Sequence, residues 1–452
     1  MKLLHILSMI LILSLSSPLL PQQEIKQDSL HIKLAKEFVE TLVTGDFISS
    51  VTRFDSTMKS LMPAEKTEEI WNGLLNKLGT FHEQIAVRQE KYKQYKIVYV
   101  TCQFKHSQFD VKVVFNPQNQ ITGLFFVPTK EIVQWETPEY ADKNLFAEID
   151  VTIGEKEWEL PGNITIPHGE GPFPALVLVH GSGPNDRDET IGPNKPFRDL
   201  AWGLASRGIA VMRYDKRTKV HGVKMVFSKH RLTVKEEAVE DAVYGVNTLK
   251  KTKRIDPENV FVLGHSLGGM LIPRIGKTDS SITGFIIMAG ATRPIEEIII
   301  EQYEYIFSLD GQLTREEQGK IQQTRDIVQM IKGLTLADTS AIEKNFLGAS
   351  PSYWLDLRGY DPPREAQKLQ NPIYILQGGR DYQVTKVDFE RWESGLDEAE
   401  NVRFKLYPAL DHLFIAGKGK SSPGDYQNPG HVDKEVINDI ATWIKGIVSS
   451  DK

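Results

Sequence analysis

The chain has 452 residues, which is too long for one ordinary domain and predicts two or three folding units. Its apolar content of 40% and charged content of 25% are those of a globular protein with a sizeable core. A net charge of −6 and a pI near 6.1 exclude the strongly basic surface with which proteins bind nucleic acid. The single cysteine, Cys102, excludes an intrachain disulfide and a zinc site built from several cysteines. The eleven histidines are scattered without an H-E-x-x-H pattern, so we expect neither a metal nor a cofactor.

The N-terminus reads MKLLHILSMILILSLSSPLLPQQ, in which Lys2 precedes an apolar stretch of roughly a dozen residues. A membrane-spanning helix needs about 20 apolar residues, so this stretch fits a secretory signal better. We predict a signal peptide over residues 1–21, cleaved near residues 16–21, and a secreted or periplasmic protein of a bacterial envelope. No membrane span is expected after cleavage. An uncleaved N-terminal anchor is the alternative.

The first folding unit is predicted as a small α+β domain over residues 25–130. Residues 29–85 have apolar side chains at helical spacing, with Gly79 as a helix stop. The period then changes, and three strands are predicted at residues 96–105, 108–116 and 121–128. Helices followed by a small antiparallel sheet are typical of an α+β domain.

The second unit is predicted over residues 140–452 as an α/β domain. Residues 146–154 and 158–167 are expected to form an antiparallel pair of strands. Short continuous apolar runs follow, as expected of parallel strands that are covered on both faces, at residues 174–183, 208–215, 259–266, 283–290, 372–379 and 402–408. Helical patterns separate most of these runs, for example at residues 234–252, which predicts a mostly parallel sheet flanked by helices.

About 75 residues between two of these strands are too many for a structureless loop in a compact domain. Their pattern is helical, and we predict an inserted helical cap over residues 293–360. It carries five aromatic residues that are interpreted either as core or as the lining of an acyl pocket: Tyr303, Tyr305, Phe307, Tyr353 and Trp354.

Ser266 lies in the segment VFVLGHSLGGM, between an apolar strand and a plausible helix start. Gly264 and Gly268 flank it and would permit the sharp turn on which a nucleophilic serine projects above a sheet. The alternative is a structural serine in a glycine-rich turn. The preceding apolar strand favours a nucleophile.

A serine hydroxyl needs a base, and a strand–helix nucleophile of this kind is followed along the chain by an acid and then a histidine. His412, directly after the last predicted strand, is the predicted base. Asp381, after the preceding strand, is the predicted acid that orients the imidazole. Asp411 and Asp388 are the weaker candidates for the acid. Arg380 is interpreted as a structural ion-pair partner.

An oxyanion hole requires two backbone amides. We predict the N–H of Leu267 and one from the loop HGSGPNDRDE, with Ser182 preferred and Gly183 left open. His180 and His265 are interpreted as packing or hydrogen-bonding residues. The charged run at residues 186–189 is interpreted as a salt-bridged loop.

The blocks HGSGPNDRDETIGPNKPF, MRYDKR, GHSLGG and QGGRDYQV together resemble the α/β-hydrolases over about residues 140–452. They are most similar to a group of bacterial secreted esterases with a small N-terminal domain, and less closely to dienelactone hydrolases and bile-acid-CoA acyltransferases/thioesterases. The resemblance implies a triad of Ser266, Asp381 and His412. The N-terminal unit resembles nuclear-transport-factor-type folds.

The expected function is hydrolysis of carboxylic esters of small or medium size by a serine hydrolase. A thioesterase or acyltransferase and a prolyl-oligopeptidase-like peptidase are the alternatives among enzymes. A binding protein on an inactive hydrolase scaffold is the alternative outside them, and the three filled triad positions disfavour it. The expected partner is a small-molecule ester.

Overall fold

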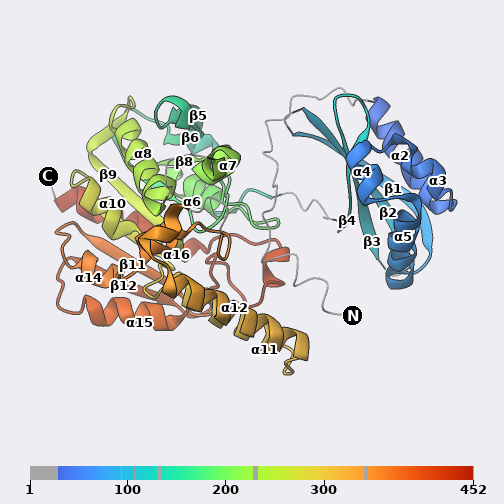
Figure 1. The fold of residues 1–452 in the computed structure, drawn as a ribbon. Coiled ribbons are helices and arrows are strands. Elements are labelled where there is room, and N and C mark those ends of the chain that lie inside the picture. The colour runs from blue at the N-terminus through green and yellow to red at the C-terminus, as the bar shows by residue number, and fades with distance from the viewer. Residues whose placement is uncertain are drawn as a thin grey trace. The chain divides into compact units, whose positions relative to one another are not determined.

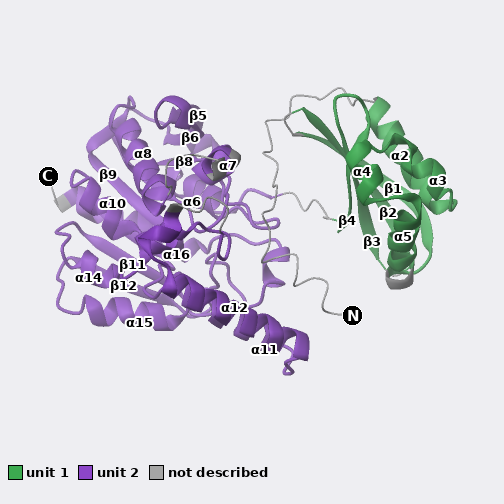
Figure 2. Cartoon of the chain, in the orientation of Figure 1, with its two compact units in different colours: residues 1–132 green, residues 133–452 purple. Residues whose placement is uncertain are grey.

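The computed structural model describes residues 29–92, 94–105, 107–129, 135–227, 233–340 and 345–450. The predicted signal peptide lies outside the described residues. The chain divides into two compact units, Met1–Ile132 and Val133–Lys452 (Figure 2). The first of these contains the predicted α+β domain, and the second contains the predicted α/β domain.

The first unit packs helices on a four-stranded antiparallel sheet of order β1-β2-β3-β4 (Figure 1). Its helices are α2 (Ser29–Val43), α3 (Phe47–Ser50), the 3-10 turn η1 (Val51–Arg53), α4 (Ser56–Leu61) and α5 (Ala64–Leu78). Its strands are β1 (Phe81–Tyr92), β2 (Tyr95–Phe104), β3 (Gln108–Phe115) and β4 (Ile121–Pro128). Helix α2 buries Leu34, Phe38 and Leu42 against this sheet, which confirms the predicted helical face.

The prediction of helix up to residue 85 is wrong, because β1 begins at Phe81. Helix α5 ends at Leu78 and is capped by Gly79, whose φ of 82° lies in the left-handed region that glycine adopts without strain. Strand β1 is an edge strand, paired only with β2. Such a strand faces solvent along one side, so its polar sequence FHEQIAVRQEKY lacks the apolar run by which the other strands are recognised.

The second unit is built on an eight-stranded sheet of order β12-β11-β10-β9-β7-β8-β6-β5. Its strands are β5 (Phe146–Ile153), β6 (Leu160–Pro167), β7 (Phe173–Val179), β8 (Ala210–Tyr214), β9 (Ile255–His265), β10 (Gly284–Met288), β11 (Ile373–Gly378) and β12 (Val402–Tyr407). Strands β7 to β12 pair in parallel, whereas β5–β6 and β6–β8 are antiparallel. The predicted antiparallel pair and the mostly parallel sheet are therefore confirmed.

Helices cover both faces of this sheet (Figure 1). They include α6 (Pro196–Ala205), α7 (Arg217–Phe227), the π-helical turn η4 (Lys235–Val239), α8 (Glu240–Lys250), α9 (Leu267–Met270), α10 (Ile272–Thr278), α15 (Lys386–Gly395) and α16 (Lys434–Ser450). Successive residues of β9 enter different cores: Val260 and Val262 pack on one side, Phe261 and Leu263 on the other. Burial on both faces explains the continuous apolar runs.

The interval between β10 and β11 is mostly helical where it is described. It contains α11 (Ile295–Ser308), α12 (Arg315–Gly333), the 3-10 turn η5 (Leu336–Ser340), α13 (Pro351–Leu357) and α14 (Pro362–Ala366). Thr314 and Glu317 form a reciprocal capping box that begins α12. Trp354 packs with Ile331 and Leu334 in a small core of its own, which supports the core interpretation of this aromatic residue. Within the described residues, no helix has the length and apolarity that crossing a membrane requires.

Candidate active site

Ser266 occupies a strained turn between β9 and α9. Its φ of 53° and ψ of −114° lie outside the regions that a serine normally adopts. A Cβ on Gly264 would lie 2.2 Å from the carbonyl oxygen of Gly268, and one on Gly268 would lie 2.3 Å from that of Val179. Both glycines are therefore required by close backbone contacts, and the Ser266 N–H donates to the Met288 carbonyl at 2.9 Å. The surrounding structure thus holds Ser266 in a conformation that costs of order 1–3 kcal/mol.

The structure brings the side chains of Asp381 and His412 into contact, and each residue follows the strand after which it was predicted. Asp381 follows β11, His412 follows β12, and the Nδ1 of His412 lies 2.6 Å from the Oδ2 of Asp381. The carboxylate is buried and also accepts hydrogen bonds from the N–H groups of Gln383 and Val384 and from the side chain of Gln377. A carboxylate with these donors is held in one orientation and fixes the imidazole proton on Nδ1.

The two weaker candidates for the acid have other partners. Asp411 accepts the N–H groups of Leu413 and Ile415 and shapes its own turn. Asp388 is buried on α15, where it binds Thr292 and Arg293. Arg380 forms an ion pair with Asp425 at 3.0 Å, in agreement with its structural interpretation.

His412 lies beside the residue that precedes Ser266. The ring of His265 is 4.7 Å from that of His412, and its Nε2 donates to the His412 carbonyl oxygen at 2.9 Å. In the described part of the chain no hydrogen bond joins the Ser266 hydroxyl to the His412 ring. The triad of Ser266, Asp381 and His412 therefore stays a prediction, with its acid–base pair in contact and the serine on the adjoining turn.

Glu189 is a site residue that the sequence did not reveal. It is buried, its Oε2 lies 2.9 Å from Nδ1 of His265, and its Oε1 accepts the Gly181 N–H at 2.7 Å. Both nitrogens of His265 thus face acceptors, the Glu189 carboxylate and the His412 carbonyl, so both carry protons and the ring is an imidazolium. Burial alone would lower the pKa of His265, but the charge of Glu189 raises it above its ordinary value.

The same ion pair lowers the pKa of the Glu189 carboxyl, whereas it raises that of His265. Burial alone would raise the pKa of the Glu189 carboxyl, and the neighbouring His265 brings it below its ordinary value. The only sequence signal for this residue is its place in the charged run at 186–189. His265 is thus the hydrogen-bonding residue that was predicted, and it links Glu189 to the loop that carries His412.

The loop after β7 borders the serine, as an oxyanion loop must. A Cβ on Gly181 would lie 3.1 Å from the Cβ of Ser266. The Gly181 N–H is taken by Glu189, whereas the N–H groups of Ser182 and Leu267 donate to no partner among the described residues. Both predicted amides are therefore available to an oxyanion.

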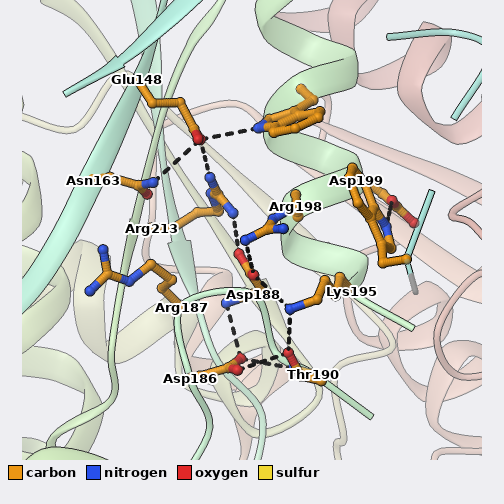
Figure 3. A network of polar contacts seen from close by, with 12 residues as sticks. Glu148, Asn163, Asp186, Arg187, Asp188, Thr190, Lys195, Arg198, Asp199 and Arg213 are labelled. Atoms are coloured by element: carbon orange, nitrogen blue, oxygen red, sulfur yellow. Dashed lines mark hydrogen bonds and ion pairs between the residues drawn. The ribbon is translucent and has the colours of Figure 1, made fainter. Parts of the chain in front are cut away.

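The rest of the charged run anchors this loop to the sheet and to α6, which confirms its salt-bridged interpretation (Figure 3). The guanidinium of the fully buried Arg213, on β8, bridges Asp188 and Glu148. Asp188 also binds Lys195 at 3.0 Å and Arg198 at 2.7 Å. Burial by itself raises the pKa of Asp188, and these three cations bring it below its ordinary value.

His180, at the start of this loop, is a packing residue, as interpreted. It is buried between Phe197 and Tyr214, and its Nε2 lies 3.0 Å from the Asp186 carbonyl oxygen. Burial lowers its pKa to about 4. Among the described residues, no three or more His, Cys, Asp and Glu side chains are grouped so that they could hold a metal ion.

A mostly parallel sheet covered by helices, with a serine on a strained turn after β9 and an acid and a histidine after β11 and β12, defines an α/β-hydrolase. Residues 175–328 match a family described as serine aminopeptidase, S33. Residues 35–124 match a family of proteins of unknown function, DUF3887.

The chain is 40% identical over 407 residues to esterase EstD of Thermotoga maritima, which covers 90% of this chain and 93% of that relative. It therefore belongs to the α/β-hydrolase family of this esterase. Solved structures with a similar fold include Est1E from Butyrivibrio proteoclasticus, at 15% identity and a TM-score of 0.42 over 66% of this chain and 99% of that chain. Another is the Pyrococcus furiosus esterase PF2001, at 16% identity and a TM-score of 0.39 over 59% of this chain and 84% of that chain.

Proposed function

We propose that the protein is a carboxylesterase that works through Ser266, His412 and Asp381. The observation that carries this proposal is the buried 2.6 Å contact between Asp381 and His412, beside the strained turn of Ser266. Membership in the family of esterase EstD supports the ester as the bond that is cleaved. Small or medium esters fit best, since a helical insertion follows β10 in the same unit.

In this mechanism the Ser266 oxygen attacks the ester carbonyl while His412 takes its proton. Asp381 keeps the second imidazole proton on Nδ1 and stabilises the imidazolium that forms. The amides of Leu267 and Ser182 donate to the oxyanion. The imidazolium then protonates the leaving alcohol, and the acyl group stays on the serine. Water, deprotonated by His412, attacks this acyl-enzyme and releases the acid.

A peptidase is the second candidate, because the family matched by residues 175–328 is described as serine aminopeptidase. The same serine, histidine and oxyanion amides would cleave an amide as well as an ester. We also propose, from the apolar stretch after Lys2, that the protein is exported to the bacterial envelope or beyond it.

The test is hydrolysis of p-nitrophenyl esters of increasing acyl length by the wild type, by Ser266→Ala and by Ser394→Ala, an exposed serine on α15, as the matched control. We expect activity in the wild type and in Ser394→Ala, with a maximum at one chain length, and none in Ser266→Ala. Labelling by a fluorophosphonate without turnover of any ester, together with cleavage of aminoacyl p-nitroanilides, would establish the peptidase instead. Ester hydrolysis that persists in Ser266→Ala would refute the assigned nucleophile.

A further inference from the structure

The peptide unit between Gly181 and Ser182 is held by a buried cation. The carbonyl oxygen of Gly181 accepts a hydrogen bond from the Lys216 ammonium at 2.7 Å and a longer one from the Asn185 side chain at 3.2 Å. Lys216 follows β8 and is only 1% exposed. A lysine is rarely buried to this degree without a specific set of partners.

The second partner of Lys216 fixes its position. Its ammonium lies 2.7 Å from Glu237, which is itself buried on η4. A buried ion pair of this kind compensates both charges where they are, so neither group gains by moving away. The Lys216 ammonium is therefore a fixed donor aimed at one carbonyl of the loop that borders Ser266.

The direction of this carbonyl determines the direction of the next N–H. The bond between Gly181 and Ser182 is trans, and in a trans peptide the C=O and the N–H point in opposite directions. With the carbonyl turned inward to Lys216, the Ser182 N–H points away from the buried ammonium. Gly181 itself adjoins Ser266, so this N–H belongs to the stretch of loop beside the nucleophile.

The loop would otherwise have freedom to turn this peptide over. Ser182 is exposed and lies between two glycines, and Gly183 has a φ of 93°. A reversed peptide would present a carbonyl oxygen, which repels an oxyanion, where an N–H is required. Reversal would also take from the Lys216 ammonium an acceptor that water cannot replace in a buried site.

We propose that Lys216 is a positioning residue of the oxyanion hole: its bond to the Gly181 carbonyl orients the Ser182 N–H toward the developing oxyanion. This inference rests on the proposed function and names Ser182, not Gly183, as the second oxyanion donor. The positive charge also polarises the peptide unit and strengthens its N–H as a donor, because hydrogen bonds in a chain reinforce one another.

The test compares an ester with the matching thionoester, in which sulfur replaces the carbonyl oxygen. Sulfur is a weak acceptor, so its hydrolysis gains little from the oxyanion hole. The variant is Lys216→Met/Glu237→Gln, which removes both charges of the pair at once and leaves neither unpaired. The matched control is Arg217→Met/Asp241→Asn, which removes the neighbouring buried ion pair, one without a contact to Gly181 among the described residues.

We expect kcat for the ester to fall about 10- to 1,000-fold in Lys216→Met/Glu237→Gln, with little change in KM. The upper end of this range corresponds to the complete loss of one oxyanion donor. The thionoester rate should fall much less, so the ratio of ester to thionoester rates drops by nearly the same factor as the ester rate. The control should keep the wild-type ratio. If the double variant lacks the near-UV circular dichroism of the wild type, Lys216→Met/Glu237→Met, which also removes both charges of the pair, provides the same comparison.

If the folded variant loses the same factor on both substrates, the ratio stays unchanged and the inference is overturned, because a merely structural role disturbs both reactions alike. Failure of the wild type to hydrolyse either substrate has a different meaning. It would refute the proposed function itself, and the inference would be lost with it.

Discussion

Glu189 offers a direct test of the buried ion pair behind Ser266. In Glu189→Ala, the Gly181 N–H and the Nδ1–H of His265 both lose their acceptor. In Glu189→Gln, the side-chain oxygen can still accept from Gly181, and the new amide N–H can donate to Nδ1 of a neutral His265. The neutral ring keeps its proton on Nε2, where it donates to the His412 carbonyl.

The two variants, Glu189→Ala and Glu189→Gln, should differ in their free energy of unfolding. Removing one partner of a buried ion pair costs about 3–5 kcal/mol, so Glu189→Ala should lower the free energy of unfolding by that amount. Glu189→Gln keeps every hydrogen bond and loses only the charge, which is worth about 1 kcal/mol. Since domains are stable by only about 5–15 kcal/mol, the alanine variant should be severely destabilised.

The pKa shifts add a dependence on pH. His265 has a raised pKa, so its contribution is complete below the unfolded value of 6.5 and is lost as pH rises through the higher folded value. Glu189 has a lowered pKa, so its contribution is complete above 4.5 and is lost as pH falls through the lower folded value. The difference between wild type and Glu189→Ala should therefore be largest between pH 4.5 and 6.5 and smaller in alkali.

Urea unfolding followed by tryptophan fluorescence measures these values, since six of the seven tryptophans lie in the second unit. Glu393→Ala, on the exposed face of α15, is the matched control. A loss below about 1 kcal/mol in Glu189→Ala would refute the assigned ion pair, whose disruption should cost more. Equal losses in the alanine and glutamine variants would refute the hydrogen-bond assignment.

Three further predictions test separate parts of the structure. Asp381→Asn should lower kcat about 10⁴-fold with the fold intact, because the imidazole is then held in the wrong tautomer; ester turnover and circular dichroism measure both, and a loss below tenfold would contradict the role of Asp381. The native state keeps buried His180 neutral down to a pKa of about 4, while the unfolded chain takes up a proton below 6.5, so acidification between these values should cost about 3 kcal/mol. That loss should be absent in His180→Phe when urea unfolding is repeated across this pH range, and an unchanged pH slope would contradict it. Gly264→Ala places a Cβ 2.2 Å from a carbonyl oxygen and should abolish activity or folding, whereas Gly319→Ala, in the open interior of α12, should raise stability by about 1 kcal/mol in thermal unfolding; comparable effects at both positions would refute the steric argument.

The sequence was sufficient wherever a local pattern determined the structure. The parallel strands of the second unit were predicted because residues such as Val260–Leu263 are buried on both faces and form continuous apolar runs. The contact between Asp381 and His412 followed from chain order, because both residues come after neighbouring parallel strands, whose carboxyl ends meet at one edge of the sheet.

Other features could not be predicted, because their causes are not local. Strand β1 depends on pairing with β2 and not on an apolar pattern of its own. The partner of Glu189 lies 76 residues away, and that of Arg213 on β5 lies 65 residues away. A charged residue in a sequence suggests an exposed position, and only the assembled fold shows that these charges are buried and paired.

Several of the buried charges lie around the loop that borders Ser266, where the orientation of the peptide groups is important. Replacing a buried ion pair by apolar residues of similar volume is often neutral or stabilising, so stability of the fold alone does not account for them. Yet three of these charges bind groups of the short loop after β7. Glu189 accepts from its Gly181 N–H, Lys216 donates to its Gly181 carbonyl, and Arg213 pairs with its Asp188 side chain. An apolar core would bury this loop without orienting its peptide groups, because apolar contacts have no direction. Directional partners are what a strained serine and two backbone amides require if they are to meet the same oxyanion.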